Sequence, residues 1–328
     1  MKEIRKILVP TDFSEGAVPA YTHAQEIAGR FGSTVDFIHV IPTLRYFGES
    51  LSRMGAPLDM ENDLYPHAQE EAQHRLGSLM DDYIHEDNRG EAVVRIDRKP
   101  SEAIAEYAGD HGYDLVVMAT HGKHETEMLR GSVTEKVIRH SPVPVFTVDQ
   151  RLSPGGLKHI LYPTDGSSAS WEALPLALAV ADTYDAEITF FHVTELYGSL
   201  AEKVTQNPNL PDEVNIYEGL LDSLEDYLID RGMDSVDLQR GEVDFEDRLV
   251  VTEGAGSHAI PARTEIRKGV SAHYAIEEYA GEYADLVVMA THGHSGLAHF
   301  FLGSTTEKVA QHVDKPVLTV RSVRREDT

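Results

Sequence analysis

Two short groups of residues that could bind an anionic ligand each occur twice in the chain. Pro-Thr-Asp stands at 10–12 and again at 163–165, each time directly after a short apolar run. Ala-Thr-His-Gly stands at 119–122 and at 290–293, and a spacer and then Gly-Ser follow each copy before a helical pattern. A glycine-rich loop lets the backbone approach a phosphate, and a helix start presents free N–H groups to it. These groups therefore predict binding of a phosphate-bearing ligand.

The second copy of the loop carries the stronger signal. Nine residues separate Gly293 from Gly303, and Ser304 then opens a helical pattern. The hydroxyls of Ser304 and Thr305 could donate hydrogen bonds to a phosphate at the helix start, where the dipole also favours negative charge. His292 lies beside the loop and could face the same phosphate. The combination predicts a phosphate site in the second half of the chain.

The two aspartates could bind the remaining parts of such a ligand. Asp12 and Asp165 each follow a predicted buried strand, and a carboxylate there could accept from a ribose hydroxyl or an adenine amine. Every candidate also has a purely structural alternative. These alternatives are N-capping by Asp12, Asp165, Ser132 and Ser304, turn formation by Gly122, Gly131, Gly293 and Gly303, and core packing by His121, His292, Met118 and Met289.

The repetition extends to a whole domain. Residues 6–40 align without a gap on 159–193 at an offset of 153, and the later repeats follow at offsets of 171 and 172. The sequence therefore predicts two domains, 1–150 and 151–328, joined by a linker at 151–157 that contains proline and glycine.

Helical and extended patterns alternate in both halves. This order is typical of βαβ units with a parallel sheet and helices on both faces. We expect two doubly wound, mainly parallel five-stranded α/β sheets, with ligands bound outside the carboxyl ends of strands where the strand order reverses. The predicted strands are 7–10, 34–40, 93–96, 115–119, 143–148, 160–163, 187–193, 286–290 and 317–320. The predicted helices are 17–31, 67–84, 101–111, 132–139, 168–184, 213–231, 271–281 and 304–312, with Ser101 as the cap of the third.

The second half carries an insertion that accounts for most of the change in offset. It lies near 238–269. Segments 245–252 and 260–268 have strand-like composition, and a glycine-rich turn at 254–257 separates them. The sequence predicts an extra β-hairpin here, which could be a partner surface or a lid over the site.

Composition limits the class of partner. The 328 residues carry 55 acidic and 29 basic side chains, for a formal net charge of −26. Such a chain repels polyanions, so we expect no nucleic-acid partner. One hypothesis is a cytoplasm of high salt, which screens the self-repulsion, and the alternative is an ordinary acidic protein.

The composition also bears on location and metals. The chain has no cysteine, which excludes disulfides and zinc sites built on cysteine. No apolar stretch is long enough for a secretory leader or a membrane span, so we expect a cytoplasmic protein without membrane contact. The close histidine pairs, at 121 with 124 and at 292 with 294, lack a clear third ligand, and no metal site is expected.

Both halves resemble the universal stress protein family, and the whole chain is similar to its tandem two-domain members. Nucleotide-binding members carry Gly, two residues, Gly, nine residues, then Gly-Ser or Gly-Thr. The second half matches the latter part but has Ala290 at the first glycine. The first half departs further, because Ala119 replaces the first glycine, the spacer has eight residues, and Glu125 and Glu127 would repel phosphate.

The resemblance implies an adenine nucleotide site in each half, stronger in the second. In the second half the base and ribose would contact Pro163, Thr164, Asp165, Val193 and Met289, and the phosphates would lie near Ala290, His292, Gly293, Gly303, Ser304 and Thr305. The matching, weaker set is Thr11, Asp12, Val40, Met118, Gly122, Gly131 and Ser132. We expect the second half to bind ATP (or AMP) better than the first, with Mg²⁺ accompanying the nucleotide.

Three functions fit this pattern. The first is a regulatory stress-response module whose nucleotide-bound state is read by a protein partner. The second is a slow ATPase, although there is no Walker-A lysine motif and we assign no catalytic residue. The third is a scaffold without nucleotide. The apolar final strands, 143–148 and 317–320, could pair within the chain as a pseudo-dimer, and two chains could associate further.

Overall fold

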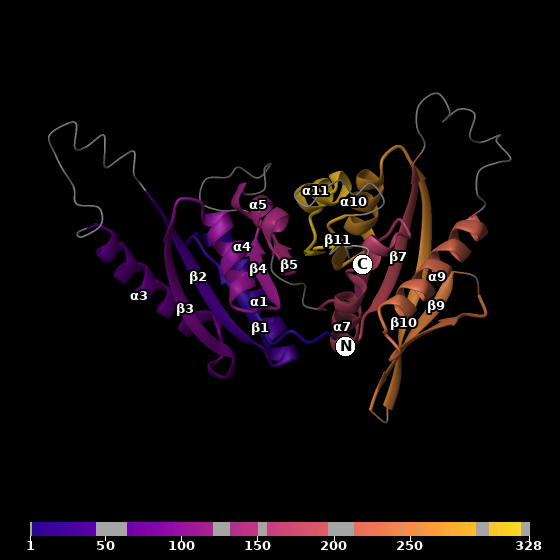
Figure 1. Ribbon diagram of the computed structural model, residues 1–328, viewed down its shortest axis with the longest axis horizontal. Coiled ribbons are helices and arrows are strands. Elements are labelled where there is room, and N and C mark those ends of the chain that lie inside the picture. The colour runs from indigo at the N-terminus through magenta and orange to yellow at the C-terminus, as the bar shows by residue number, and fades with distance from the viewer. Residues whose placement is uncertain are drawn as a thin grey trace. The chain divides into compact units, whose positions relative to one another are not determined.

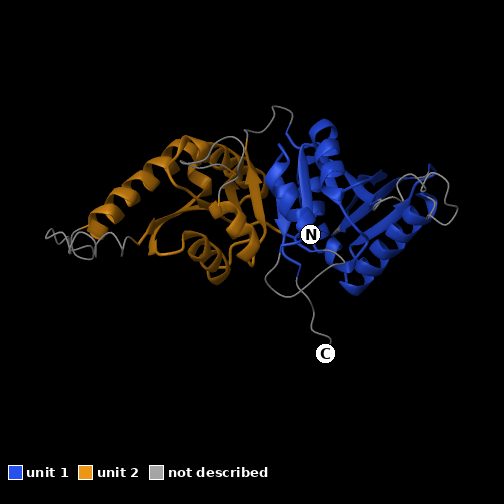
Figure 2. Cartoon of the chain, turned by 90° about the horizontal axis from the view of Figure 1, so that it is seen from above, with its two compact units in different colours: residues 1–2, 152–328 blue, residues 3–151 orange. Residues whose placement is uncertain are grey.

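The chain forms two compact units (Figure 2). The computed structural model describes residues 2–43, 64–120, 132–149, 156–195, 213–243, 245–254, 256–292 and 302–322. One unit contains residues 3–151 and is called the first half below. The other contains 152–328 with residues 1–2 and is called the second half. Most of the predicted linker lies outside the described residues.

The first half alternates strands with helices (Figure 1). Its strands are β1 (Lys6–Pro10), β2 (Thr34–Pro42), β3 (Arg89–Asp97), β4 (Leu115–Ala119) and β5 (Val145–Val148). Its helices are α1 (Val18–Phe31), α3 (Tyr65–Tyr83), α4 (Pro100–Asp110) and α5 (Ser132–His140), with short 3-10 turns η1 (Glu15–Ala17) and η3 (Glu86–Asn88).

Its five strands lie in the order β3-β2-β1-β4-β5, and all the pairings are parallel. The central strands are continuous apolar runs, as expected where helices cover both faces of a sheet. Ile7, Leu8 and Val9 of β1 are fully buried. The strand order reverses between β1 and β4, which places the first-half Pro-Thr-Asp at the switch point of the sheet.

The second half repeats this arrangement with additions. Its strands are β6 (His159–Pro163), β7 (Glu187–Glu195), β8 (Val236–Arg240), β9 (Glu246–Glu253), β10 (Gly256–Gly269), β11 (Leu286–Ala290) and β12 (Val317–Val320). Its helices are α6 (Ser168–Trp171), α7 (Leu174–Tyr184), α9 (Glu213–Asp230), α10 (Ala272–Tyr283) and α11 (Ser304–His312).

The described part of this sheet has seven strands, in the order β12-β11-β6-β7-β10-β9-β8. β10 pairs with β7 in parallel, just as β3 pairs with β2, so β10 is the third strand of the repeat. β9 runs antiparallel to both β10 and β8. The seven strands are the five of the repeat and two additions, as predicted. The predicted hairpin is β9 with β10, but the added strands are β8 and β9.

One predicted helix and one predicted helix cap need correction. The predicted helix 168–184 is two helices, α6 and α7, because Pro175 lies in the first turn of α7 and cannot donate a helical hydrogen bond there. The cap predicted at Ser101 was wrong, since Lys99 is the N-cap of α4 and Pro100 its first residue. No helix in the described ranges is both long and apolar enough to cross a membrane.

One carboxylate contact is repeated in the two halves. Asp114 Oδ2 accepts from the N–H groups of Arg5 and Lys6, at 2.8 and 3.0 Å. Asp285 Oδ2 accepts from Lys158 and His159 in the same way, at 2.9 and 3.0 Å. Each contact fixes the start of the first strand of a half against the strand beside it, so the carboxyl ends of these strands also keep a fixed register.

Candidate functional site

A pocket of about 150 Å³ lies at the carboxyl ends of β6, β7 and β11, where the strand order of the second half reverses. All of the predicted second-half site residues that the structure describes line it. They are Pro163, Thr164, Asp165, Val193, Met289, Ala290, His292, Gly303, Ser304 and Thr305. Gly293 lies outside the described residues. The pocket also includes Ser170, Phe191, His192, Ala272, Ile276 and Thr306, which the sequence analysis did not identify.

Thr164 anchors the end of β6 at the pocket floor. Its N–H donates to the carbonyl of Phe191 at 3.0 Å, which continues the ladder between β6 and β7. Its hydroxyl bonds to the Ser170 hydroxyl at 2.8 Å and accepts from the N–H of Gly166 at 3.1 Å. The threonine is buried, with 7% of its surface exposed. The Thr164 hydroxyl is therefore engaged mainly in stabilising the loop.

Asp165 stabilises the same loop through hydrogen bonds to Ser167. Its Oδ1 accepts from the N–H of Ser167 at 3.0 Å and from the Ser167 hydroxyl at 2.6 Å. The N-cap of α6 is Ser167, whose hydroxyl oxygen accepts from the N–H of Ser170. The alternative in which Asp165 itself caps the helix was therefore wrong. Gly166 has a φ of 75°, a conformation that suits glycine and turns the chain sharply here.

His192 adds a polar group that the sequence analysis missed. Its Nδ1 lies 3.1 Å from the carbonyl oxygen of Thr164. A carbonyl can only accept, so Nδ1 carries the proton and Nε2 of the neutral ring is an acceptor. His39 makes the matching contact with the Thr11 carbonyl at 2.7 Å. The recurrence of His before Val in both repeats was the signal that could have identified it.

The N-terminus of α11 forms the opposite wall. Gly303 is the N-cap, its carbonyl accepts from the N–H of Glu307, and no side chain caps the helix. Ser304 is the first helical residue, so its alternative role as the N-cap was wrong. The amides of residues 304–306 are the ones that an α-helix leaves without an intrahelical acceptor. Thr306 Oγ1 donates to the carbonyl of Ala290 at 2.9 Å and holds this helix start against β11.

Gly303 is required by a close approach of backbone segments. Its N–H donates to the Thr291 carbonyl at 2.8 Å, and a Cβ at this position would lie 3.0 Å from the same oxygen. That distance is shorter than ordinary van der Waals contact. The glycine therefore serves the local backbone, whatever it contributes to a ligand.

An apolar wall completes the pocket. Phe191, Ile276 and Met289 belong to one buried cluster, and Val193 packs against it. Glu195 Oε1 accepts from the N–H of Ala272 at 2.7 Å, which fixes the start of α10 beside the end of β7. A flat apolar ring could lie against this wall while polar groups of β6 and α11 contact its substituents.

The pocket has few ionisable lining groups. Its titratable lining groups are Asp165, His192 and His292, and its described lining includes neither lysine nor arginine. His273, which follows the pocket residue Ala272 in α10, has its pKa lowered by burial and by nearby Lys308 and His312. Within the described ranges, His, Asp and Glu side chains form no group of three or more that could hold a metal ion.

The first half has a related arrangement. The hydroxyl of Thr11 accepts from the N–H of Phe13 at 2.9 Å, and Asp12 Oδ1 accepts from the N–H of Ser14 at 2.9 Å. Val40 and Met118 are buried at strand ends, and Ser132 is the first residue of α5. Gly122 and Gly131 lie outside the described residues, so the loop between β4 and α5 is not described.

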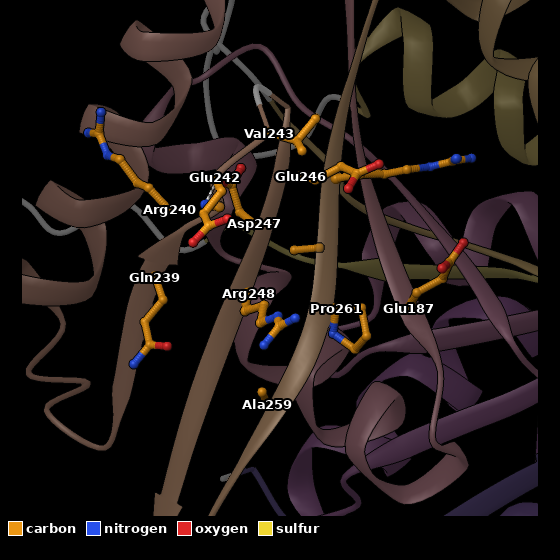
Figure 3. A pocket seen from close by; sticks show the side chains of 13 residues that line it. Glu187, Gln239, Arg240, Glu242, Val243, Glu246, Asp247, Arg248, Ala259 and Pro261 are labelled. Carbon is orange, nitrogen blue, oxygen red and sulfur yellow. Dashed lines mark hydrogen bonds between the residues drawn. The ribbon is translucent and has the colours of Figure 1, made fainter.

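A larger hollow of about 820 Å³ lies over β8, β9 and β10 (Figure 3). Two of its arginines bond to neighbouring side chains. Arg240 bonds to Glu218 and Asp222, and Arg263 donates to Tyr279 Oη at 2.8 Å. The described residues that line it include none of the predicted site residues. We therefore assign the candidate site to the smaller pocket at the strand ends.

Tandem α/β halves with a pocket at the switch point of the sheet define a class of ligand-binding proteins. The model of the universal stress protein family matches residues 3–149 and 156–321. The chain belongs to the universal stress protein family and contains two of its domains in tandem.

Individual relatives agree with this assignment. Universal stress protein MJ0577 of Methanocaldococcus jannaschii is 32% identical over 158 residues, which cover 45% of this chain and 97% of the relative. A universal stress protein of Mycolicibacterium smegmatis is 23% identical over 318 residues, 96% of each chain. The crystal structure of a universal stress protein from Archaeoglobus fulgidus has a TM-score of 0.61 at 20% identity, covering 98% of this chain and 97% of that one. This last likeness concerns the fold.

Proposed function

We propose that this protein is a regulatory module that binds an adenine nucleotide, such as ATP or AMP, in the pocket of its second half. The observation that carries the proposal is the convergence of three elements on one pocket. These are the Thr164-Asp165 turn after β6, the apolar wall of β7 and β11, and the uncapped start of α11.

Each element suits one part of a nucleotide. The apolar wall around Phe191 and Met289 suits a purine ring, and the acceptors of Asp165 and His192 suit an exocyclic amine or ribose hydroxyls. The amides at the start of α11, with the Ser304 and Thr305 hydroxyls, suit a phosphate. Mg²⁺, if it accompanies the nucleotide, would have Asp165 as its carboxylate ligand among the described lining residues.

A regulatory role follows from what binding would change. The pocket joins β6, β7, α10 and α11, which come together from separate parts of the second half. A nucleotide that contacts all of them would stabilise one arrangement of these elements, and a protein partner could read that arrangement.

The first test is mass spectrometry of nucleotide released from the protein after native purification. We expect an adenine nucleotide at no more than one equivalent per chain. Calorimetric titration of nucleotide-free protein should then compare Asp165→Asn with Asp12→Asn, because the two aspartates are matched by the repeat. We expect Asp165→Asn to weaken binding about tenfold or more, since a hydrogen bond to a charged group contributes about 1.5–3 kcal/mol. Equal effects of the two variants, or no binding by the unmodified chain, would refute the proposal.

A further inference from the structure

The second-half pocket has few positive charges with which to bind a polyphosphate. Its described lining residues include neither lysine nor arginine. They include one carboxylate, that of Asp165. The sequence from Thr291 to Thr305 contains three histidines and neither lysine nor arginine. Binding of a phosphate here would therefore depend on neutral donors, on the dipole of α11 and on histidine.

The first half provides a contrast within the same chain. Its matching segment, from Thr120 to Val133, contains Lys123 and Arg130. Sites that bind a triphosphate commonly place a lysine on the β- and γ-phosphates and add a divalent cation. The second half lacks such a lysine in the corresponding segment, although its pocket gathers the predicted ligand-binding groups.

Charge then favours a small anion. A helix start provides about half of a positive charge, enough to favour one phosphate group. Each additional phosphate adds negative charge, and no cationic side chain lies among the described lining residues to offset it.

We propose that the second-half pocket selects adenine nucleotides with a single phosphate group, as a 5′-monophosphate or a cyclic monophosphate, over the triphosphate. This inference rests on the proposed function, because it names the class of nucleotide for the same pocket. Occupancy of the pocket would then follow the concentration of the monophosphate, and ATP would compete only weakly for the site.

Calorimetric titration of the full chain with adenosine, AMP, cyclic AMP and ATP tests the inference, with ATP titrated in the presence and absence of Mg²⁺. We expect AMP or cyclic AMP to bind at least about tenfold more tightly than ATP under both conditions, and more tightly than adenosine. ATP binding as tight as the better monophosphate would overturn the inference but leave the proposed function intact. Adenosine binding as tight as AMP would also overturn it, because the phosphate would not be recognised. Absence of all binding would refute the inference and the proposed function together.

A charge substitution tests the electrostatic cause directly. Ser304 is exposed at the start of α11, so a longer side chain can be accommodated. We expect Ser304→Lys to improve ATP affinity relative to AMP by about fivefold or more, with Ser304→Gln as the neutral control of similar length. An equal ATP-to-AMP ratio in the two variants would contradict the electrostatic cause. Circular dichroism melting of both variants verifies that the fold is retained.

Discussion

At the residue scale, the repeat supplies a matched control for most site residues. Thr305 is the informative exception, because Val133 occupies its position in the first half. Threonine and valine have nearly the same shape, so the exchange removes a hydroxyl and little else. Gly303 is a poorer probe, since any side chain there would press on the Thr291 carbonyl and change the loop.

We predict that Thr305→Val weakens nucleotide binding about tenfold, because a hydrogen bond to a charged phosphate is lost. Calorimetric titration with the best-binding nucleotide measures the effect. Val133→Thr should leave that affinity unchanged. Retention of full affinity by Thr305→Val would show that its hydroxyl does not contact the ligand.

Much of the pocket could be predicted from residue types and their repetition. Thr164, Asp165 and Ser304 recur at matched positions after strands and before a helix, and the structure brings them together. The sequence did not predict Ile276 or Ser170. Their part in the pocket depends on how α10 and α6 pack against the sheet, and short-range patterns do not specify that packing.

At the element scale, a buried hydrogen bond helps to hold α11 against β11. Thr306 is 4% exposed and its hydroxyl donates to the Ala290 carbonyl at the end of β11. Thr134 makes the same contact with the Ala119 carbonyl at 3.0 Å in the first half. The two contacts have the same chemistry, but only the second-half contact lies at the candidate site.

We predict that Thr306→Val and Thr134→Val each destabilise their own half by about 1–3 kcal/mol, because a buried carbonyl loses its donor. Thermal unfolding monitored by circular dichroism should show comparable losses for the two variants. Nucleotide affinity should fall in Thr306→Val alone. A similar fall in Thr134→Val would argue against assigning the site to the second half.

The contact between α10 and α11 should respond to pH through His273. This side chain is 8% exposed, its Nδ1 lies 2.6 Å from Ser271 Oγ, and Glu195 and Glu277 partly oppose the lowering of its pKa by burial and by Lys308 and His312. Since its native pKa lies below the ordinary value of 6.5, the unfolded chain binds more protons below about pH 6.5. Its contribution to stability is therefore lost as the pH falls through that range.

We predict that His273→Asn loses less thermal stability than the unmodified protein between pH 7.5 and 5.5. Asparagine keeps a polar group near Ser271 but cannot titrate in this range. Melting temperatures of both proteins at several pH values measure the difference. Parallel pH profiles would show that His273 does not contribute to the pH response.

The types of most elements were predictable, because apolar runs and helical spacing are strong signals of strands and helices. The identity of the third strand of the second-half repeat was not predictable. The segment 260–268 has strand composition, and its partner could not be chosen locally. The structure pairs β10 with β7 over residues 262–269. This long-range parallel contact decides that β8 and β9 are the additions.

At the scale of the whole molecule, net charge is the dominant property. The formal charge of −26 makes the folded chain repel itself, and salt screens that repulsion. We predict that raising KCl from about 0.1 M to 1 M, where the Debye length falls from about 10 to 3 Å, increases the melting temperature. A melting temperature that is constant or lower in high salt would contradict the hypothesis of a protein suited to a saline cytoplasm.

The two halves share a fold but are predicted to differ in function. The second half has Thr305 where the first has Val133, and the first-half loop carries Glu125 and Glu127. Pairing of the final strands of the two halves as a pseudo-dimer remains a prediction, as does association of two chains.

The most direct test of the account is a crystal structure of the full chain grown with AMP. We predict nucleotide density in the second half, with the base against Met289, the ribose near Asp165 and the phosphate at the amides of residues 304–306. Density confined to the first half, or a second-half pocket without nucleotide at saturating AMP, would contradict the central claim.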